Sequence, residues 1–209
     1  MGQLKYLVIH TADTPYNREV TADDIVLWHK GALKNKDGTY TFLGKKYSLA
    51  NLKKQTLTLP SGKKINAAQT NGRGWVKAGY ADLIQRSGNI LNITPYNFDN
   101  QIYIWEVTNG VANYNSVCRH ICLAGGWLPD GSNKSTGKLN GQYLKPEQLY
   151  TSEQLKSLEK YVLMQLEMQP SLIVCGHNQL AIKSCPNFKV PDWLKSVGIN
   201  CKTLSVYKY

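Results

Sequence analysis

The chain has 209 residues, of which 42% are apolar, and this length is sufficient for one α/β domain with a sizeable core. Five cysteines at irregular spacing do not indicate a disulfide framework, so we expect Cys118, Cys122, Cys175 and Cys201 to be core thiols. No apolar stretch approaches the length of a membrane span. The net charge of +11 indicates an anionic partner or surface, but the basic residues follow no nucleic-acid-binding motif, and we expect no nucleic-acid partner.

The first predicted strand, residues 5–10, is a short apolar run that ends in His10. The residues before it carry one lysine and no long apolar region, so they do not resemble a signal peptide. We therefore expect synthesis in the cytoplasm without a signal peptide. Because His10 lies at the end of a buried strand, its side chain is in a position to face a crevice.

A helix is predicted to follow, because residues 21–24 have the pattern of a capping box. Ile25, Trp28 and Ala32 recur at helical spacing and predict its buried face. His29 lies one residue away from that face, so we expect a helix-surface histidine that packs on a neighbour.

Residues 33–74 are rich in Lys, Gly, Asn and Thr, and a hairpin is predicted around residues 56–67. The aromatic side chains of this region either contact sugar rings or pack a small core of their own. Packing is the expectation for at least half of the set formed by Tyr40, Phe42, Tyr47 and Trp75.

The middle of the chain is predicted to hold four strands, at residues 80–85, 90–93, 101–107 and 117–123. The first two are joined as a hairpin by the turn at residues 86–89. His120 alternates within the last of these strands and is expected to be structural. Residues 127–150 form a long loop, and loops of this length are uncommon without a function.

Two helices are predicted near the C-terminus. Thr151 caps the first, and its apolar residues share one face: Leu155, Leu158, Val162 and Leu166. Residues 190–198 predict a short second helix with proline in its first turn. Together with the strands, these helices predict a single α/β domain over residues 1–209, in which helices flank a central mixed sheet.

The residues with the clearest chemistry lie in the segment 171–186, where an apolar run predicts a buried strand and His177 follows its end. Cys185 comes shortly afterwards, in a turn with Pro186. If this strand lies beside residues 5–10 and points the same way, His10, His177 and Cys185 meet at one rim of the sheet. Imidazole and thiolate are donors that Zn²⁺ prefers, and three protein ligands with an open fourth position are typical of a catalytic zinc site. Each residue alone has a plainer interpretation, as a hydrogen-bonded histidine or a buried thiol.

Several segments, in this order along the chain, resemble the zinc N-acetylmuramoyl-L-alanine amidases of the phage-lysozyme type, which are relatives of the peptidoglycan recognition proteins. The matching segments are residues 7–12, 25–30, 79–80, 115–126, 150–158 and 177–188. The last of these is the most specific. Relative to this family, residues 33–74 and 127–150 resemble insertions.

The resemblance implies an endolysin-type, bacteriolytic enzyme that uses Zn²⁺ to hydrolyse the amide between N-acetylmuramic acid and L-alanine. It implies His10, His177 and Cys185 as zinc ligands and Tyr80 as a catalytic residue whose hydroxyl points at the metal. Lys183, close to Cys185 in the same loop, is placed to stabilise the oxyanion. The expected partner is peptidoglycan or a muropeptide, without membrane insertion. We expect a monomer that acts on the bacterial cell wall after release or delivery, and the wall's anionic groups suit the positive charge.

Two other functions stay open at this point. A non-catalytic peptidoglycan-recognition module has a similar fold, but such relatives typically lack the cysteine-position ligand, so Cys185 favours the enzyme. A basic nucleic-acid-binding protein with a structural zinc would need four protein ligands, and the sequence offers three.

Overall fold

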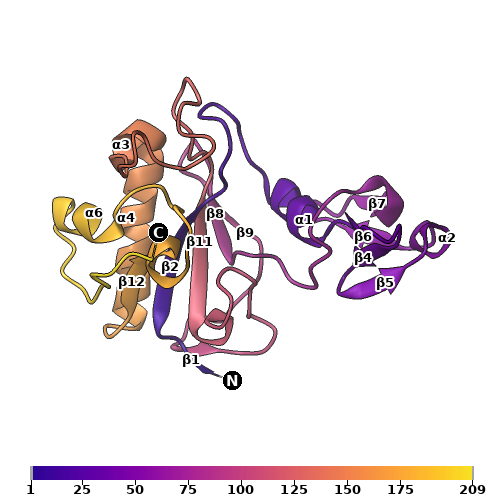
Figure 1. Cartoon of the computed structure of the whole chain (residues 1–209). Coiled ribbons are helices and arrows are strands. Elements are labelled where there is room, and N and C mark those ends of the chain that lie inside the picture. Colours follow the sequence, from indigo (N-terminus) through magenta and orange to yellow (C-terminus); the bar gives the residue numbers. More distant parts are fainter. Residues whose placement is uncertain (1, 209) are drawn as a thin grey trace.

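The computed structural model of the protein describes residues 2–208. A main body surrounds a central sheet, and a smaller lobe projects from one side of it (Figure 1). We call this lobe, residues 33–74, the arm. Within residues 2–208, every helix is too short or too polar to cross a bilayer.

The central sheet has five strands in the order β12, β2, β11, β8 and β9. Their bounds are β12 Ile173–Gly176, β2 Tyr6–Thr11, β11 Cys118–Leu123, β8 Asp82–Ile84 and β9 Ile90–Asn92. The first four strands run parallel, and β9 returns antiparallel to β8. The sheet is therefore mixed, as predicted, and β2 lies between β12 and β11.

Alternate residues of the strands are buried on the two faces of the sheet. On one face, Ile9 and Ile121 belong to the largest apolar cluster, together with residues of α4 Ser152–Met168 and α6 Val190–Ser196. On the other face, Leu83 and Cys122 pack with Ile25 of α1 Ala22–Lys30. Figure 1 shows α4 and α6 on one side of the sheet and α1 on the other, so helices flank it as predicted.

The helices begin where the sequence predicts, because their capping residues bond the first turn. The Asp24 amide donates to Thr21 Oγ1, and Asp24 Oδ2 accepts from the Thr21 amide at 2.9 Å. Thr151 and Gln154 form the same reciprocal pair at the start of α4. Three further short helical segments complete the main body: α3 Pro146–Leu149, α5 His177–Leu180 and the 3-10 turn η2 Asn115–Val117.

The arm contains a three-stranded antiparallel sheet and a hairpin. Its elements are β3 Leu33–Lys34, β4 Tyr40–Phe42, β5 Lys45–Tyr47, α2 Leu49–Leu52, β6 Thr56–Thr58, β7 Lys64–Asn66 and the 3-10 turn η1 Ala67–Gln69. Phe42, Leu52 and Leu57 form an apolar cluster of the arm that extends to Val26 of α1. The arm is thus a small packed unit attached to α1, and the predicted hairpin within it is confirmed.

The prediction of a strand over residues 101–107 is wrong for most of that segment. Only β10 Gln101–Ile102 is extended, and it pairs with β1 Gly2–Gln3. The chain then turns, because the buried carboxylate of Glu106 accepts hydrogen bonds from the amides of Tyr103 and Asn97 at 3.1 and 2.6 Å. An alternating apolar pattern does not reveal this local side-chain bond.

Candidate metal centre

His10, His177 and Cys185 come together at the carboxyl ends of β2 and β12. His10 lies near the end of β2, and His177 begins α5 directly after β12. Cys185 follows α5 in a loop. Because β2 and β12 are adjacent and parallel, their carboxyl ends share one edge of the sheet. The two strands therefore lie as the sequence analysis required.

The donor atoms of these three residues lie within 4.8 Å of one another, and the group has the composition of a metal site. His10 Nδ1 lies 3.6 Å from Cys185 Sγ, and the ring centroids of His10 and His177 are 4.7 Å apart. His10 is buried, whereas His177 and Cys185 are partly exposed. Among residues 2–208, no second group of three or more His, Cys, Asp or Glu side chains is arranged so that it could hold a metal ion.

The protonation states of the three side chains suit a bound cation. Burial, and then the neighbouring histidines, hold the pKa of His10 well below its usual value, and burial lowers that of His177 to about 4. Both imidazoles are therefore neutral near pH 7, with a lone pair to donate. Burial raises the pKa of the Cys185 thiol to about 12, although the Thr11 amide donates to Sγ at 3.2 Å. A bound divalent cation would lower the pKa of this thiol and convert it to a thiolate. Two neutral imidazoles and one such sulfur fit Zn²⁺.

His120 contacts the centre, although its position in the sequence indicated only a structural residue. Its Nδ1 lies 3.0 Å from His10 Nε2, and the His120 side chain is fully buried. Gly110 provides the space, because a Cβ at that position would lie 2.4 Å from the His120 ring. The signal that would have revealed this contact is the strand register, since Cys122 pairs with His10 and His120 shares the face of Cys122.

Tyr80 lies beside the centre but before the strand that it was predicted to begin, since β8 starts at Asp82. Its ring centroid is 5.1 Å from those of both His10 and His29. Burial, followed by the nearby Cys122 and Cys185, raises the pKa of Tyr80 well above its usual value. The hydroxyl therefore stays protonated and able to donate a hydrogen bond.

His29 packs on a neighbour as expected, but it is buried and does not lie on the helix surface. Its Nδ1 accepts the Gly79 amide at 3.0 Å, and its ring stacks on Trp75 with centroids 5.1 Å apart. Burial, followed by the charge of Arg73, lowers the pKa of His29 to about 4, so the ring is neutral. His29 thus holds the backbone directly before Tyr80, while three other residues form the metal group.

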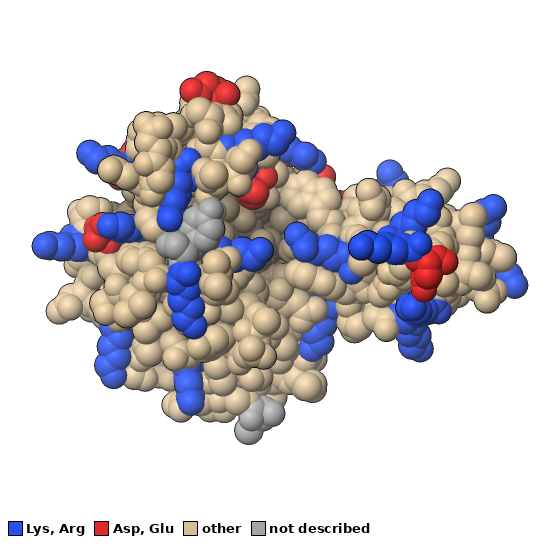
Figure 2. All heavy atoms as spheres, viewed as in Figure 1, with Lys and Arg blue, Asp and Glu red and all other residues tan. Residues whose placement is uncertain are grey.

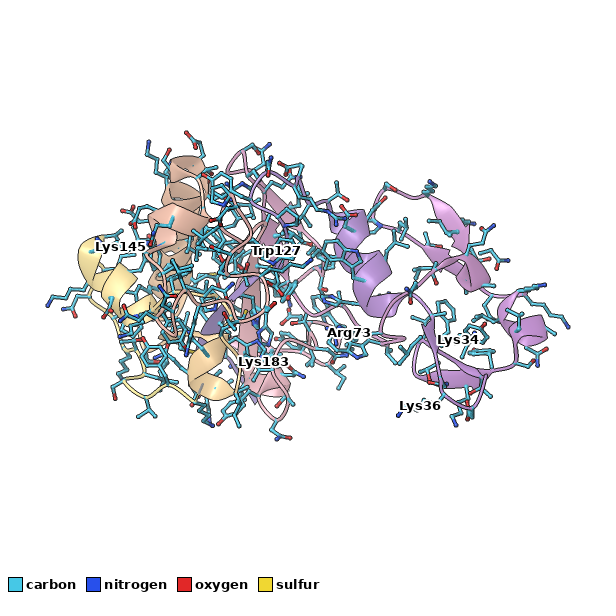
Figure 3. All side chains as sticks on the ribbon, turned by 45° about the horizontal axis from the view of Figure 1, so that its top comes forward. Lys34, Lys36, Arg73, Trp127, Lys145 and Lys183 are labelled. Carbon is cyan, nitrogen blue, oxygen red and sulfur yellow. The ribbon has the colours of Figure 1, made fainter. Side chains whose placement is uncertain are left out.

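Lys183 is exposed on the loop between α5 and Cys185 (Figure 3). Its positive charge acts on both His177 and Cys185 and lowers the pKa of each side chain, although burial has the larger effect on both. The ammonium is therefore close enough to act electrostatically on the centre while it remains accessible to solvent.

The segment 127–150 was predicted as a loop throughout, but its last part forms α3, and its start contacts the residues that follow β2. The Trp127 indole donates to the carboxylate of Asp13 at 2.8 Å, and the Lys134 ammonium lies 4.8 Å from the Trp127 ring centroid. Asp13 adopts a left-handed backbone with φ 54°, which is uncommon for a residue other than glycine. The contact places the start of the long loop next to the residues that follow His10.

No family model matches the chain. The endolysin of Enterobacteria phage K11 is 26% identical over 124 residues, which cover 59% of this chain and 68% of the phage protein. The relative found by sequence is thus a phage endolysin.

Two solved structures share the fold at low sequence identity. The Ph2119 endolysin of a Thermus scotoductus bacteriophage has a TM-score of 0.52 and 14% identity, over 93% of this chain and 85% of that one. Apis mellifera PGRP-SA has a TM-score of 0.50 and 14% identity, over 99% of this chain and 88% of that one. At such identities the likeness shows a common fold and not a common activity.

Proposed function

We propose that the protein is a zinc-dependent peptidoglycan hydrolase that cleaves the amide between N-acetylmuramic acid and L-alanine. The observation that carries the proposal is the meeting of His10, His177 and Cys185 at one edge of the sheet, with their donor atoms within 4.8 Å. The similarity to a phage endolysin and the resemblance of the sequence motifs to the amidases support it.

His10, His177 and Cys185 would hold the metal in this proposal. Zn²⁺, when bound, supplies a Lewis acid that polarises a carbonyl and acidifies water towards a pKa of about 7. The three protein ligands leave room for substrate, which is the arrangement expected of a catalytic rather than a structural zinc site. The buried position of His10 gives the ligand set a rigid base.

Tyr80 and Lys183 would act on the reacting amide. The Tyr80 hydroxyl is protonated and its ring lies beside the ring of His10, so the hydroxyl would orient the attacking water or donate to the developing oxyanion. The Lys183 ammonium would stabilise the same negative charge from the solvent side of the centre. Both groups act by position and charge, and neither is needed to hold the metal.

The remaining features of the proposal concern the whole chain. Residues 1–209 would form one amidase domain, in which the segments near 33–74 and 127–150 are insertions. The protein would act as a monomer on the cell wall after release or delivery, as expected of an endolysin. Peptidoglycan or a muropeptide would be its partner.

A non-catalytic peptidoglycan-recognition module is the second candidate, because Apis mellifera PGRP-SA shares the fold. Digestion of purified peptidoglycan separates the two. The enzyme releases new L-alanine amino termini without new reducing sugar ends, whereas a recognition module binds the wall and releases neither. New reducing ends in place of amino termini would identify a glycosidase and would overturn the proposed bond.

A further inference from the structure

The positive charge of the chain is concentrated on the arm. Residues 33–74 contain nine Lys or Arg residues and one Asp, a net charge of +8 out of +11 for the whole chain. The fold brings these basic residues onto one projecting lobe. Figure 2 shows basic side chains over the visible face and the edge of the arm.

The lysines of the arm are available to a partner. All eight are exposed: Lys34, Lys36, Lys45, Lys46, Lys53, Lys54, Lys63 and Lys64. Lys46 pairs with Asp37 at 3.1 Å, and within residues 2–208 the other ion pair is Arg18–Asp24, outside the arm. Most of the charge is therefore not neutralised within the protein, and it produces an attractive field for anions that salt screens.

The aromatic residues of the arm pack against its own core, although Tyr40 and Tyr47 are partly exposed. Phe42 is buried, its ring lies 6.3 Å from that of Tyr47, and Tyr40 packs against the same cluster. Trp75, just beyond the arm, stacks on His29. Three of the four side chains thus pack the arm's own core, which was the expectation for at least half of them.

The exposed side chains of the arm favour one class of anionic partner over others. Single-stranded nucleic acids bind on exposed aromatic platforms, and membrane surfaces take up exposed apolar side chains. The exposed large apolar residues of the arm are Leu33 and Leu49, on different elements of the arm. With its tyrosines packed on the core and only partly exposed, the arm offers mainly charge, which suits a hydrated anionic polymer.

The arm is anchored to α1 and is not on a free linker, and its end at Arg73 lies near Tyr80. The Ser61 hydroxyl and amide donate to the Asp23 carboxylate of α1 at 2.6 and 3.0 Å. At the other end of the arm, the Arg73 guanidinium lies 5.3 Å from the Trp75 ring centroid, and its charge acts on Tyr80. In the view of Figure 3, Arg73 lies between Lys183 and Lys34. A polymer that reaches the centre can thus continue onto the arm.

We propose that the arm is a docking surface for peptidoglycan. The lysines of the arm bind carboxylates of stem peptides that neighbour the stem peptide being cleaved. This inference rests on the proposed function, because peptidoglycan is the anionic polymer which that function brings to the centre. It adds a second binding surface that contains none of the metal-ligand or catalytic residues.

Two variants of equal net charge test the proposal. The arm variant carries Lys53→Gln, Lys54→Gln, Lys63→Gln and Lys64→Gln, and the control variant carries Lys156→Gln, Lys160→Gln, Lys195→Gln and Lys202→Gln. All eight lysines are exposed, and each variant lowers the net charge from +11 to +7. Binding to insoluble peptidoglycan free of phosphate polymers is measured by co-sedimentation on ice, before the wall dissolves. Melting temperatures establish that both variants are folded.

The arm variant should bind about tenfold more weakly than wild type, since four exposed ion pairs each contribute a fraction of a kcal/mol. The control variant should bind like wild type. Conversion of the wall carboxylates to neutral amides should abolish the difference, and so should high salt. Equal weakening of both variants, or of neither, would overturn the localised docking surface.

Two further binding measurements identify the partner, one with wall that retains its phosphate polymers and one with duplex DNA. Arm-dependent binding that requires wall phosphate polymers, or that is tighter to duplex DNA of the same charge concentration, would overturn peptidoglycan as the partner. The outcome is separable from that of the proposed function. Arm-dependent binding without release of amino termini would contradict the hydrolase alone, and cleavage without arm dependence would contradict the docking surface alone.

Discussion

His10 Nε2 lies 3.0 Å from His120 Nδ1, while His10 Nδ1 faces Cys185 Sγ at 3.6 Å. A His10 that binds a metal through Nδ1 must carry its proton on Nε2 and donate it to His120 Nδ1. His120 must then carry its own proton on Nε2, a buried atom without a hydrogen-bond partner among the described residues. With a metal on His10, the protein would leave one buried donor unsatisfied, and the contact would orient the ring of the ligand.

Replacement of His120 should therefore weaken metal binding. In His120→Leu the acceptor is absent, and we expect zinc affinity to fall about 10- to 100-fold, as is typical for loss of a partner of a metal-binding histidine. His120→Asn places an amide oxygen near the former Nδ1 position and should restore much of the affinity. Competition with a chromophoric chelator measures both. Equal zinc affinity for the wild type and His120→Leu would contradict an orienting role.

The buried His29 should make stability depend on pH. Its pKa is about 4 in the folded protein and about 6.5 when unfolded, so below pH 6.5 the unfolded state takes up a proton that the folded state does not. The contribution of neutral His29 to the free energy of unfolding is fully present above pH 6.5 and is lost as the pH falls towards 4. His29→Asn retains an acceptor for the Gly79 amide without this titration. Between pH 7 and 5 the metal-free wild type should lose about 2 kcal/mol more than the variant in urea unfolding. Identical pH dependence of unfolding in the wild type and His29→Asn would show that His29 is not the group whose protonation destabilises the fold.

Substitutions of Cys185 test the ligand set. Cys185→Ser should lose the metal, because a neutral hydroxyl replaces a thiolate. Cys185→Asp supplies an anionic oxygen, which zinc also accepts, and should retain part of the metal and of the activity. Metal content per chain and initial rates distinguish the two variants, and the same result for both would count against Cys185 as a ligand.

Tyr80 and Lys183 should affect the chemical step and not the metal content. Tyr80→Phe and Lys183→Ala should each keep zinc and an unchanged melting temperature. Each should lose roughly a hundred- to a thousandfold in turnover, the usual effect of removing one oxyanion donor. Zinc content and initial rates on purified peptidoglycan are measured together. Near-normal rates in both variants would leave the metal group intact and reject the assigned mechanism.

The features predictable from the sequence are those that depend on local pattern or on strand ends. The start of α4 at Thr151 follows from its capping box, and His10 and His177 meet because parallel strands share an edge. The contact between His10 and His120 was not predictable, since it depends on the register of two strands far apart in the chain. Burial of His29 likewise depends on Trp75 and Gly79, which no helical periodicity identifies.

The proposed activity depends above all on zinc at the His10, His177 and Cys185 group. The most direct test is to strip the purified protein of metal, add Zn²⁺ in measured amounts, and follow release of L-alanine amino termini from purified peptidoglycan. Activity should be absent at the start and should rise in proportion to zinc up to about one equivalent per chain, as one three-ligand site requires. Full activity in the stripped protein, or none at one equivalent of bound zinc, would contradict the account.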